Sequence, residues 1–241
     1  MTTAAVLTAA GSGTRLGHRL PKGLVELAGV PLVVRAARGL ERAGCLSAVV
    51  VTVPPHEVAG FRALFVGGRV PGTRLPAVVV PGGATRQASV AAGVAALDDD
   101  VDVVLVHDAA RCLTPSELVR RVEAAVREGH RAVVPALPVS DTVKQVGAPD
   151  ASGAEPVRAT LDRAVLRAVQ TPQGFDRELL EAAHAAGASR AGDETLAATD
   201  DAGLVEALGE TVWVVPGHER AMKITTPRDL ALARLLLDEP A

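Results

Sequence analysis

The sequence predicts an α/β fold: a three-layer α/β/α sandwich around a mostly parallel, Rossmann-like sheet, with an inserted β-arm. Continuous Val-rich runs alternate with segments of helical period, and such runs are typical of strands that are covered on both faces. The expected strands are residues 4–8, 48–53, 77–80, 101–106, 132–136 and 211–215. The expected helices are residues 32–43, 86–97, 116–128, 176–186, 200–208 and 227–237. Ligand chemistry is then expected beyond the carboxyl ends of the strands.

The alternation of strands and helices breaks in one stretch, at about residues 138–160. Residues 140–146 read as a strand, 147–156 are rich in Gly, Pro, Ala and Asp, and 157–161 can return as a second strand. Two strands alone seldom stay folded in water, so we expect this arm to pair with a second copy of the chain in a homodimer. A surface insertion is the alternative. The rest needs only one domain, and residues 1–241 are interpreted as a single domain.

The composition excludes several classes of partner. Aromatic residues make up only 2% of the 241 residues and the formal net charge is −3, so neither a base-stacking platform nor a basic surface for nucleic acid is expected. Cys45 and Cys112 lack the spacing of a disulfide framework or zinc knuckle, which favours a reducing cytoplasm. No apolar run approaches twenty residues, so a membrane location is not expected. The partner is expected to be a small molecule.

A glycine-rich loop follows the first expected strand. Gly11, Gly13 and Gly17 let backbone N–H groups turn toward an anion without obstruction by a Cβ atom. Arg15 and Lys22 add two full positive charges to the same loop. Two cations suit a triphosphate whose charge grows during a reaction, and we therefore interpret the loop as a phosphate site.

Two familiar phosphate loops fit this stretch less well. A Walker loop needs Lys followed by Ser or Thr after its last glycine, but His18 and Arg19 follow Gly17. The dinucleotide fingerprint is one residue too long here, and residues 52–55 offer no acid to bind a ribose. A nicotinamide-dependent oxidoreductase therefore stays as an alternative from another class, beside a non-catalytic nucleotide sensor and a simple glycine-rich turn.

Two more strand ends carry polar residues. Gly82 begins a glycine pair that leads into a helix with Arg86 and Ser89 in its first turn, a place that can hold a phosphate, a ribose or a base edge. An ordinary helix cap is the alternative. Asp108 ends a buried strand, where a carboxylate needs a compensating cation, and Mg²⁺ bound together with substrate phosphates would supply one. The alternative is a structural pair of Asp108 with Arg111.

Further candidates lie in the second half of the chain. Thr142 and Arg163 belong to the arm and its return, and residues 170–175 read as a turn with a free hydroxyl. Lys223 lies in an extended segment just before a helix that Thr226 can cap. Residues 199–201, Thr-Asp-Asp, read as another N-cap with acidic residues in its first turn, which is a structural role.

Seven motifs occur in an order that resembles a known family: AAGSGTRLG, GGATRQASV, VHDAAR, PVSDTVK, TLDRA, QTPQGF and MKITTPRDL. The chain resembles the bacterial 2-C-methyl-D-erythritol 4-phosphate cytidylyltransferases over roughly residues 4–237. The resemblance implies a magnesium-dependent homodimer that converts CTP and methylerythritol phosphate into CDP-methylerythritol and pyrophosphate. Ribitol-5-phosphate cytidylyltransferases share much of this motif order, so ribitol 5-phosphate or another polyol phosphate stays an alternative acceptor.

The resemblance also implies roles for individual residues. Those expected to act on the transition state or position the sugar phosphate are Arg15, Lys22, Arg163 and Lys223. Those expected to bind CTP are Ala9, Ala10, Gly11, Gly13, Gly82, Arg86 and Ser89. Asp108 is expected on the magnesium side, and the sugar-phosphate pocket is expected to include Arg111, Thr142 and Thr171. The chain departs from the family at Gly23, where Gln is frequent, and at Ala221, where Asn is frequent.

Overall fold

The computed structural model describes residues 1–11, 16 and 20–238. In this part of the chain an eight-stranded sheet has the order β10-β7-β11-β6-β1-β4-β5, with β12 also pairing with β7. Its strands are β1 (Thr2–Thr8), β4 (Ala48–Val53), β5 (Ala77–Pro81), β6 (Val101–Asp108), β7 (Ala132–Pro138), β10 (Arg167–Val169), β11 (Gln173–Asp176) and β12 (Trp213–Pro216). A small β2–β3 pair (Glu26–Leu27 and Val30–Pro31) stands apart. The half of the sheet around β1 is parallel, whereas β10 and β11 run antiparallel to their neighbours.

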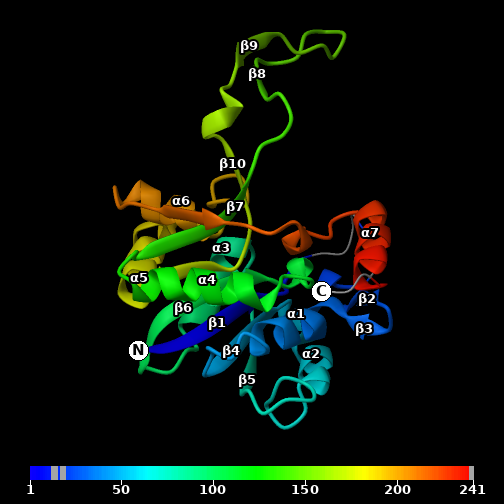
Figure 1. Ribbon diagram of the computed structural model, residues 1–241, viewed down its shortest axis with the longest axis vertical. Coiled ribbons are helices and arrows are strands. Elements are labelled where there is room, and N and C mark those ends of the chain that lie inside the picture. The colour runs from blue at the N-terminus through cyan, green and yellow to red at the C-terminus, as the bar shows by residue number, and fades with distance from the viewer. Residues whose placement is uncertain (12–15, 17–19, 239–241) are drawn as a thin grey trace.

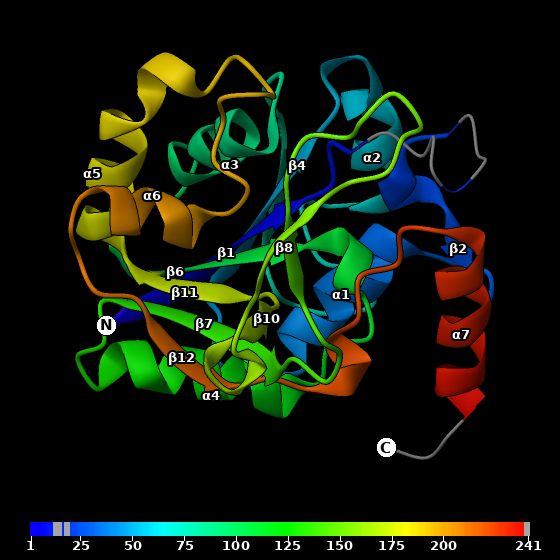
Figure 2. The ribbon, with the colours of Figure 1, turned by 90° about the horizontal axis from the view of Figure 1, so that it is seen from above.

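Helices cover both faces of the sheet, as expected for a three-layer sandwich. They are α1 (Leu32–Glu41), α2 (Val58–Leu64), α3 (Arg86–Val94), α4 (Ser116–Arg127), α5 (Arg177–Ala186), α6 (Asp201–Ala207) and α7 (Pro227–Asp238). Figure 2 shows α3, α5 and α6 on one side of the sheet and α1 and α4 on the other. Along β1, Ala5 and Leu7 pack into one apolar core while Ala4 and Val6 pack into the other. This two-sided burial explains why the strand sequences are continuously apolar.

The expected strands and helices are all present, with ends that differ by up to three residues. The interpretation of residues 170–175 as a turn was wrong in part, because Gln173 begins β11, a strand in the middle of the sheet. Gly174 hid this strand from a search for apolar residues. A Cβ at Gly174 would lie 2.7 Å from Val122 Cγ1, so α4 packs directly on the backbone of β11. Helix α2 was not expected from the sequence either.

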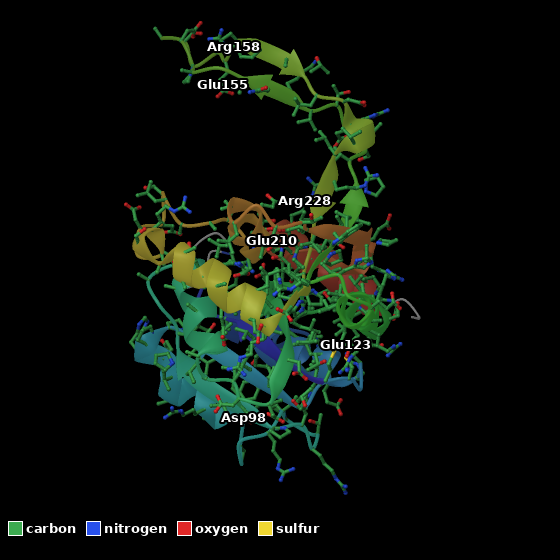
Figure 3. The ribbon with its side chains drawn as sticks, turned by 90° about the vertical axis from the view of Figure 1, so that its left-hand side faces the viewer. Asp98, Glu123, Glu155, Arg158, Glu210 and Arg228 are labelled. Atoms are coloured by element: carbon green, nitrogen blue, oxygen red, sulfur yellow. The ribbon has the colours of Figure 1, made fainter. Side chains whose placement is uncertain are left out.

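The arm leaves the sheet between β7 and β10 and contains a hairpin of β8 (Lys144–Val146) and β9 (Val157–Thr160). Figure 1 shows it standing clear of the other layers, and Figure 3 shows its far end, where Glu155 and Arg158 are labelled. Val146, Val157 and Val165 are 44%, 58% and 76% exposed, although they are apolar. The hairpin expected from the sequence is therefore confirmed, with a first strand shorter than expected. No helix in the described residues has the length and apolar character needed to cross a membrane.

Candidate active site

The carboxyl ends of β1 and β6 form one wall of a cavity of about 450 Å³. The two strands are parallel and in register, so Thr8 lies beside Asp108. The backbone then turns away from the sheet at both ends and leaves space above them. The predicted site residues that line this cavity are Ala9, Ala10, Gly11, Lys22, Arg86, Ser89, Asp108 and Lys223. Residues far apart in the sequence are thus brought to one place by the strand order.

Asp108 is the anionic centre of the cavity wall. Its Oδ2 atom is 2.7 Å from Lys223 Nζ, and its Oδ1 atom is 3.2 Å from Arg86 Nε. Thr8 Oγ1 also donates a hydrogen bond to Oδ1, at 3.2 Å. Burial alone would raise the pKa of Asp108, but the charges of Arg86 and Lys223 outweigh it and hold the pKa well below its ordinary value. The carboxylate therefore stays ionised at neutral pH.

Arg86 is held from behind by a second carboxylate. Its Nη1 atom donates to Asp201 Oδ2 at 2.7 Å, and Asp201 is only 1% exposed. His184 Nε2 lies 3.0 Å from the other oxygen of Asp201. Burial would lower the pKa of Arg86, but Asp201 and Asp108 outweigh it and raise that pKa. Arg86 is therefore a permanent cation with a fixed direction.

The purely structural reading of residues 199–201 missed this contact. Asp200 does cap α6, because its Oδ1 atom accepts a hydrogen bond from Gly203 N at 3.0 Å. Asp201 instead turns inward to Arg86. The signal that could have found it is an acidic residue on the buried side of a helix whose neighbours Ala202 and Val205 are apolar.

The start of α3 shapes the wall opposite β1. Thr85 caps the helix by accepting from Ala88 N at 3.1 Å, and Ser89 Oγ donates to Thr85 O at 2.8 Å. Gly83 N in turn donates to Ser89 Oγ at 3.1 Å. A Cβ at Gly82 would lie 2.7 Å from Ser89 Oγ, so only glycine fits there without movement. Ser89 and Gly82 therefore hold the loop close to the helix.

Lys223 is carried by an extended segment just before α7. Ile224 N donates to Ala110 O at 2.9 Å, which fastens this segment to the end of β6. Thr226 Oγ1 accepts from Asp229 N at 3.2 Å, as expected for the helix cap. The Lys223 side chain is 41% exposed although it pairs with Asp108. Its ammonium group is thus open to the cavity.

Two residues expected near the sugar phosphate act on the backbone around this wall. Arg111 pairs with neither printed carboxylate partner of the site; its guanidinium donates to Ala221 O at 2.7 Å and to Val169 O at 3.2 Å. Thr171 Oγ1 accepts from Asp108 N at 3.1 Å and lies 2.9 Å from His107 Nδ1. Burial lowers the pKa of His107 to about 4, so its ring is neutral at pH 7.

Other expected residues lie elsewhere. Thr142 and Arg163 are exposed and belong to the arm and its return, where Arg163 donates to Ser140 O. Neither lines the cavity described above. Gly13 and Arg15 lie outside the described residues, so their roles stay predictions. The cavity also includes residues that the sequence analysis did not single out: Thr8, Thr225 and Glu194.

Comparisons with known proteins agree on one family. The sequence model described as 2-C-methyl-D-erythritol 4-phosphate cytidylyltransferase matches residues 3–239. A protein of that name from Streptomyces avermitilis is 51% identical over 98% of this chain and 91% of its own length. The crystal structure of the Thermus thermophilus protein of that name is 38% identical, with a TM-score of 0.74 over 98% of both chains.

A more distant structure shares the same architecture. The 4-diphosphocytidyl-2C-methyl-D-erythritol synthase of Anaerococcus prevotii is 27% identical, with a TM-score of 0.80 over 99% of both chains. The similarity therefore includes the sheet, the cavity wall and the arm rather than a single motif. The chain belongs to the 2-C-methyl-D-erythritol 4-phosphate cytidylyltransferase family.

Proposed function

We propose that this chain transfers the cytidylyl group of CTP to 2-C-methyl-D-erythritol 4-phosphate, giving CDP-methylerythritol and pyrophosphate for isoprenoid precursor biosynthesis. Membership of the family and about half identity to a relative of that name support the reaction. One observation of the site supports it most: Asp108 lies between Arg86 and Lys223 on the wall of a cavity that Lys22 also lines. The cavity and its charges lie within what we interpret as a single nucleotidyltransferase domain.

The chemistry needs no nucleophilic side chain. An oxygen of the acceptor phosphate is already anionic and can attack the α-phosphorus of CTP, while the bond from that phosphorus to the bridging oxygen of pyrophosphate breaks. The main obstacle is repulsion between two anions, which at about 4 Å and an effective dielectric near 20 is roughly 4 kcal/mol per pair of unit charges. Cations that line the cavity offset this repulsion, and they are in place before the reaction.

The cations of the cavity are held differently and can have different tasks. Arg86 is fixed between two carboxylates, so it supplies a steady positive charge near the triphosphate. Lys223 is partly exposed and makes one ion pair, which leaves ammonium hydrogens for the acceptor phosphate. Lys22 lines the same cavity at the glycine-rich loop. With Arg15, expected from the sequence in that loop, it would stabilise the charge that moves onto pyrophosphate.

Magnesium is part of this proposal, and the residues present fit one way of holding it. Among the described residues no group of three or more His, Cys, Asp or Glu could hold a metal ion. Asp108 would therefore be the protein ligand, with substrate phosphates and waters completing the set, as is usual for Mg²⁺. A carboxylate has about four lone-pair sites, and the structure occupies three of them, from Thr8, Arg86 and Lys223. Bound magnesium would neutralise phosphate charge.

A homodimer formed through the arm is also part of the proposal. The hairpin exposes Val146, Val157 and Val165, and its polar candidates Thr142 and Arg163 line no part of the cavity of their own chain. A second copy that covers the apolar side chains would bring those polar groups to another surface. Two free cysteines, Cys45 and Cys112, are consistent with the cytoplasmic location that we propose.

The decisive experiment is a turnover screen that measures pyrophosphate release. The four nucleoside triphosphates are tested with magnesium and either methylerythritol phosphate or ribitol 5-phosphate. We expect release with CTP and methylerythritol phosphate; preference for ribitol 5-phosphate would contradict the acceptor and leave the reaction type intact. Lys22→Ala should keep the fold and reduce turnover by roughly two orders of magnitude. Reduction of NAD with no pyrophosphate release would instead favour an oxidoreductase, an alternative that the family match no longer supports.

A further inference from the structure

Three consecutive residues at the root of the arm contact both sides of the Asp108–Lys223 ion pair. Val169 O accepts a hydrogen bond from Arg111 at 3.2 Å, and Thr171 Oγ1 accepts from the backbone N–H of Asp108 at 3.1 Å. Gln170 lies between them and is only 5% exposed. The Asp108 side of the ion pair is thus fixed by Thr171. The side that carries Lys223 needs a separate anchor.

Gln170 provides that anchor through both ends of its carboxamide. Nε2 donates to His218 O at 2.9 Å, and His218 N donates to Oε1 at 2.9 Å. The backbone of Gln170 is itself fixed, because its N–H donates to Pro135 O of β7 at 2.7 Å. A Cβ at Gly217 would lie 2.4 Å from Oε1, so the carboxamide packs directly against the backbone there.

The segment held in this way leads to Lys223 in five residues. His218 O also accepts from Ala221 N at 2.9 Å, and Ala221 O accepts from Arg111 at 2.7 Å. These bonds fix the turn that ends just before Lys223. The lysine side chain itself is long and 41% exposed, so its position depends on where its backbone is held.

We infer that Gln170 is a positioning residue for Lys223, which holds the backbone of His218 and so places the ammonium group against Asp108. The inference rests on the proposed function, because it assigns Lys223 a place near the acceptor phosphate. Both polar ends of the carboxamide are used on one residue, His218, so removing them loosens this segment first. Thr171 stays free to hold Asp108 in such a variant.

The test compares Gln170→Leu with a control that loses a similar number of buried hydrogen bonds elsewhere. Thr3→Val is that control: Thr3 is 2% exposed, donates to Glu123 at 3.0 Å and accepts from Arg127 at 2.9 Å, at the end of β1 away from the cavity. Gln170→Leu should reduce kcat/KM for the acceptor roughly tenfold, since small misplacements of reacting groups cost at least that much. Thr3→Val should stay within about twofold of the original chain.

A double-mutant cycle separates positioning from general destabilisation. In a chain that already carries Lys223→Met, adding Gln170→Leu should change the residual kcat/KM by less than about twofold, because the group that Gln170 positions is gone. Effects that multiply in the double variant, or a Gln170→Leu variant that behaves like Thr3→Val, would overturn the inference. Gln170→Asn, whose shorter side chain cannot bridge both atoms of His218, replaces Gln170→Leu if the latter does not fold.

Hydrogen exchange gives a readout that does not depend on catalysis. The backbone amides of residues 218–224 should exchange faster in Gln170→Leu than in the original chain, and unchanged exchange there would contradict the anchor. Thr3→Val should leave these amides unaffected. If the original chain releases no pyrophosphate, the proposed function fails while the exchange data still test the anchor. If it is active and Gln170→Leu is equally active, the inference alone fails.

Discussion

The wall of the cavity and the arm contain the predicted site residues in opposite surroundings. Asp108 and Asp201 are 6% and 1% exposed, and each has a charged partner within 3.2 Å. Thr142 and Arg163 are exposed, and apolar side chains such as Val165 stand beside them in solvent. The wall is thus finished within one chain, whereas the arm has surface that nothing in this chain covers. A buried charge must be paired where it folds, but an exposed one can wait for a second surface.

The first way to sharpen this comparison is Asp108→Asn, for which we expect the largest effect. Arg86 and Lys223 would lose the anion between them, and Arg86 would be left with Asp201 alone. Turnover should fall by about 10²- to 10³-fold, the range seen when one preorganised charge interaction is removed from a site. The measurement is pyrophosphate release at saturating CTP.

Asp98→Asn is the matched control, because Asp98 is an exposed carboxylate just before the strand that ends at Asp108 (Figure 3). We expect its turnover to stay near that of the original chain. A loss of equal size in both variants would mean that the buried wall has no special role.

The second test is the pH dependence that His107 gives to the wall. The pKa of His107 is lowered from 6.5 to about 4 by burial, so the folded chain favours the neutral ring. The unfolded chain therefore binds more protons between these pH values. The stability from His107 is fully present above pH 6.5 and is lost as the pH falls toward 4. At about 1.4 kcal/mol for each pH unit, the loss is about 3 kcal/mol.

Chemical denaturation at several pH values measures this effect. His107→Gln cannot titrate, yet its amide can still bond to Thr171. Subtracting its curve of unfolding free energy against pH from that of the original chain isolates the histidine. A difference that stays flat from pH 6.5 to pH 4 would show that the ring is not buried as a neutral group.

The third test is Asp201→Asn, which weakens the hold on Arg86 without touching the cavity. The neutral amide would leave Arg86 with one carboxylate, Asp108, and His184 would lose its charged partner. We expect kcat/KM to fall roughly tenfold, less than for Asp108→Asn, because Arg86 is displaced rather than removed. His184→Gln keeps the Asp201–Arg86 pair and should lose less activity; the reverse order would contradict the role of Asp201.

The sequence predicted the wall better than it predicted what supports the wall. Asp108, Arg86 and Lys22 follow strands or begin helices, and the rule that ligands bind at the carboxyl ends of parallel strands needs only the strand assignments. Asp201 was missed because its partner Arg86 is 115 positions away, and no local pattern records such a pair. Strand β11 was missed because Gly174 is fitted to helix α4, a contact between distant segments. Local periodicity therefore locates a site, while long-range packing decides how its side chains are held.

The arm offers the smallest expected effect on stability and the sharpest contrast with the wall. Val157 is 58% exposed and makes up part of a two-stranded hairpin. Val157→Ser should change the unfolding free energy of the single chain by less than about 0.5 kcal/mol, because the side chain buries little surface there. If a second copy covers the arm, the same substitution should weaken the dimer, since an apolar contact becomes polar.

Sedimentation over a range of concentrations measures that dimer, and thermal unfolding measures the fold of each chain. Val78→Ser is the control, because Val78 is 51% exposed on the sheet edge strand β5, away from the arm. A weaker dimer in Val157→Ser alone would show that the arm is finished by a partner, as the wall is finished by its own chain. Equal dimerisation in all three proteins would leave the arm an insertion, and Thr142 and Arg163 would then have no route to a site through a second copy.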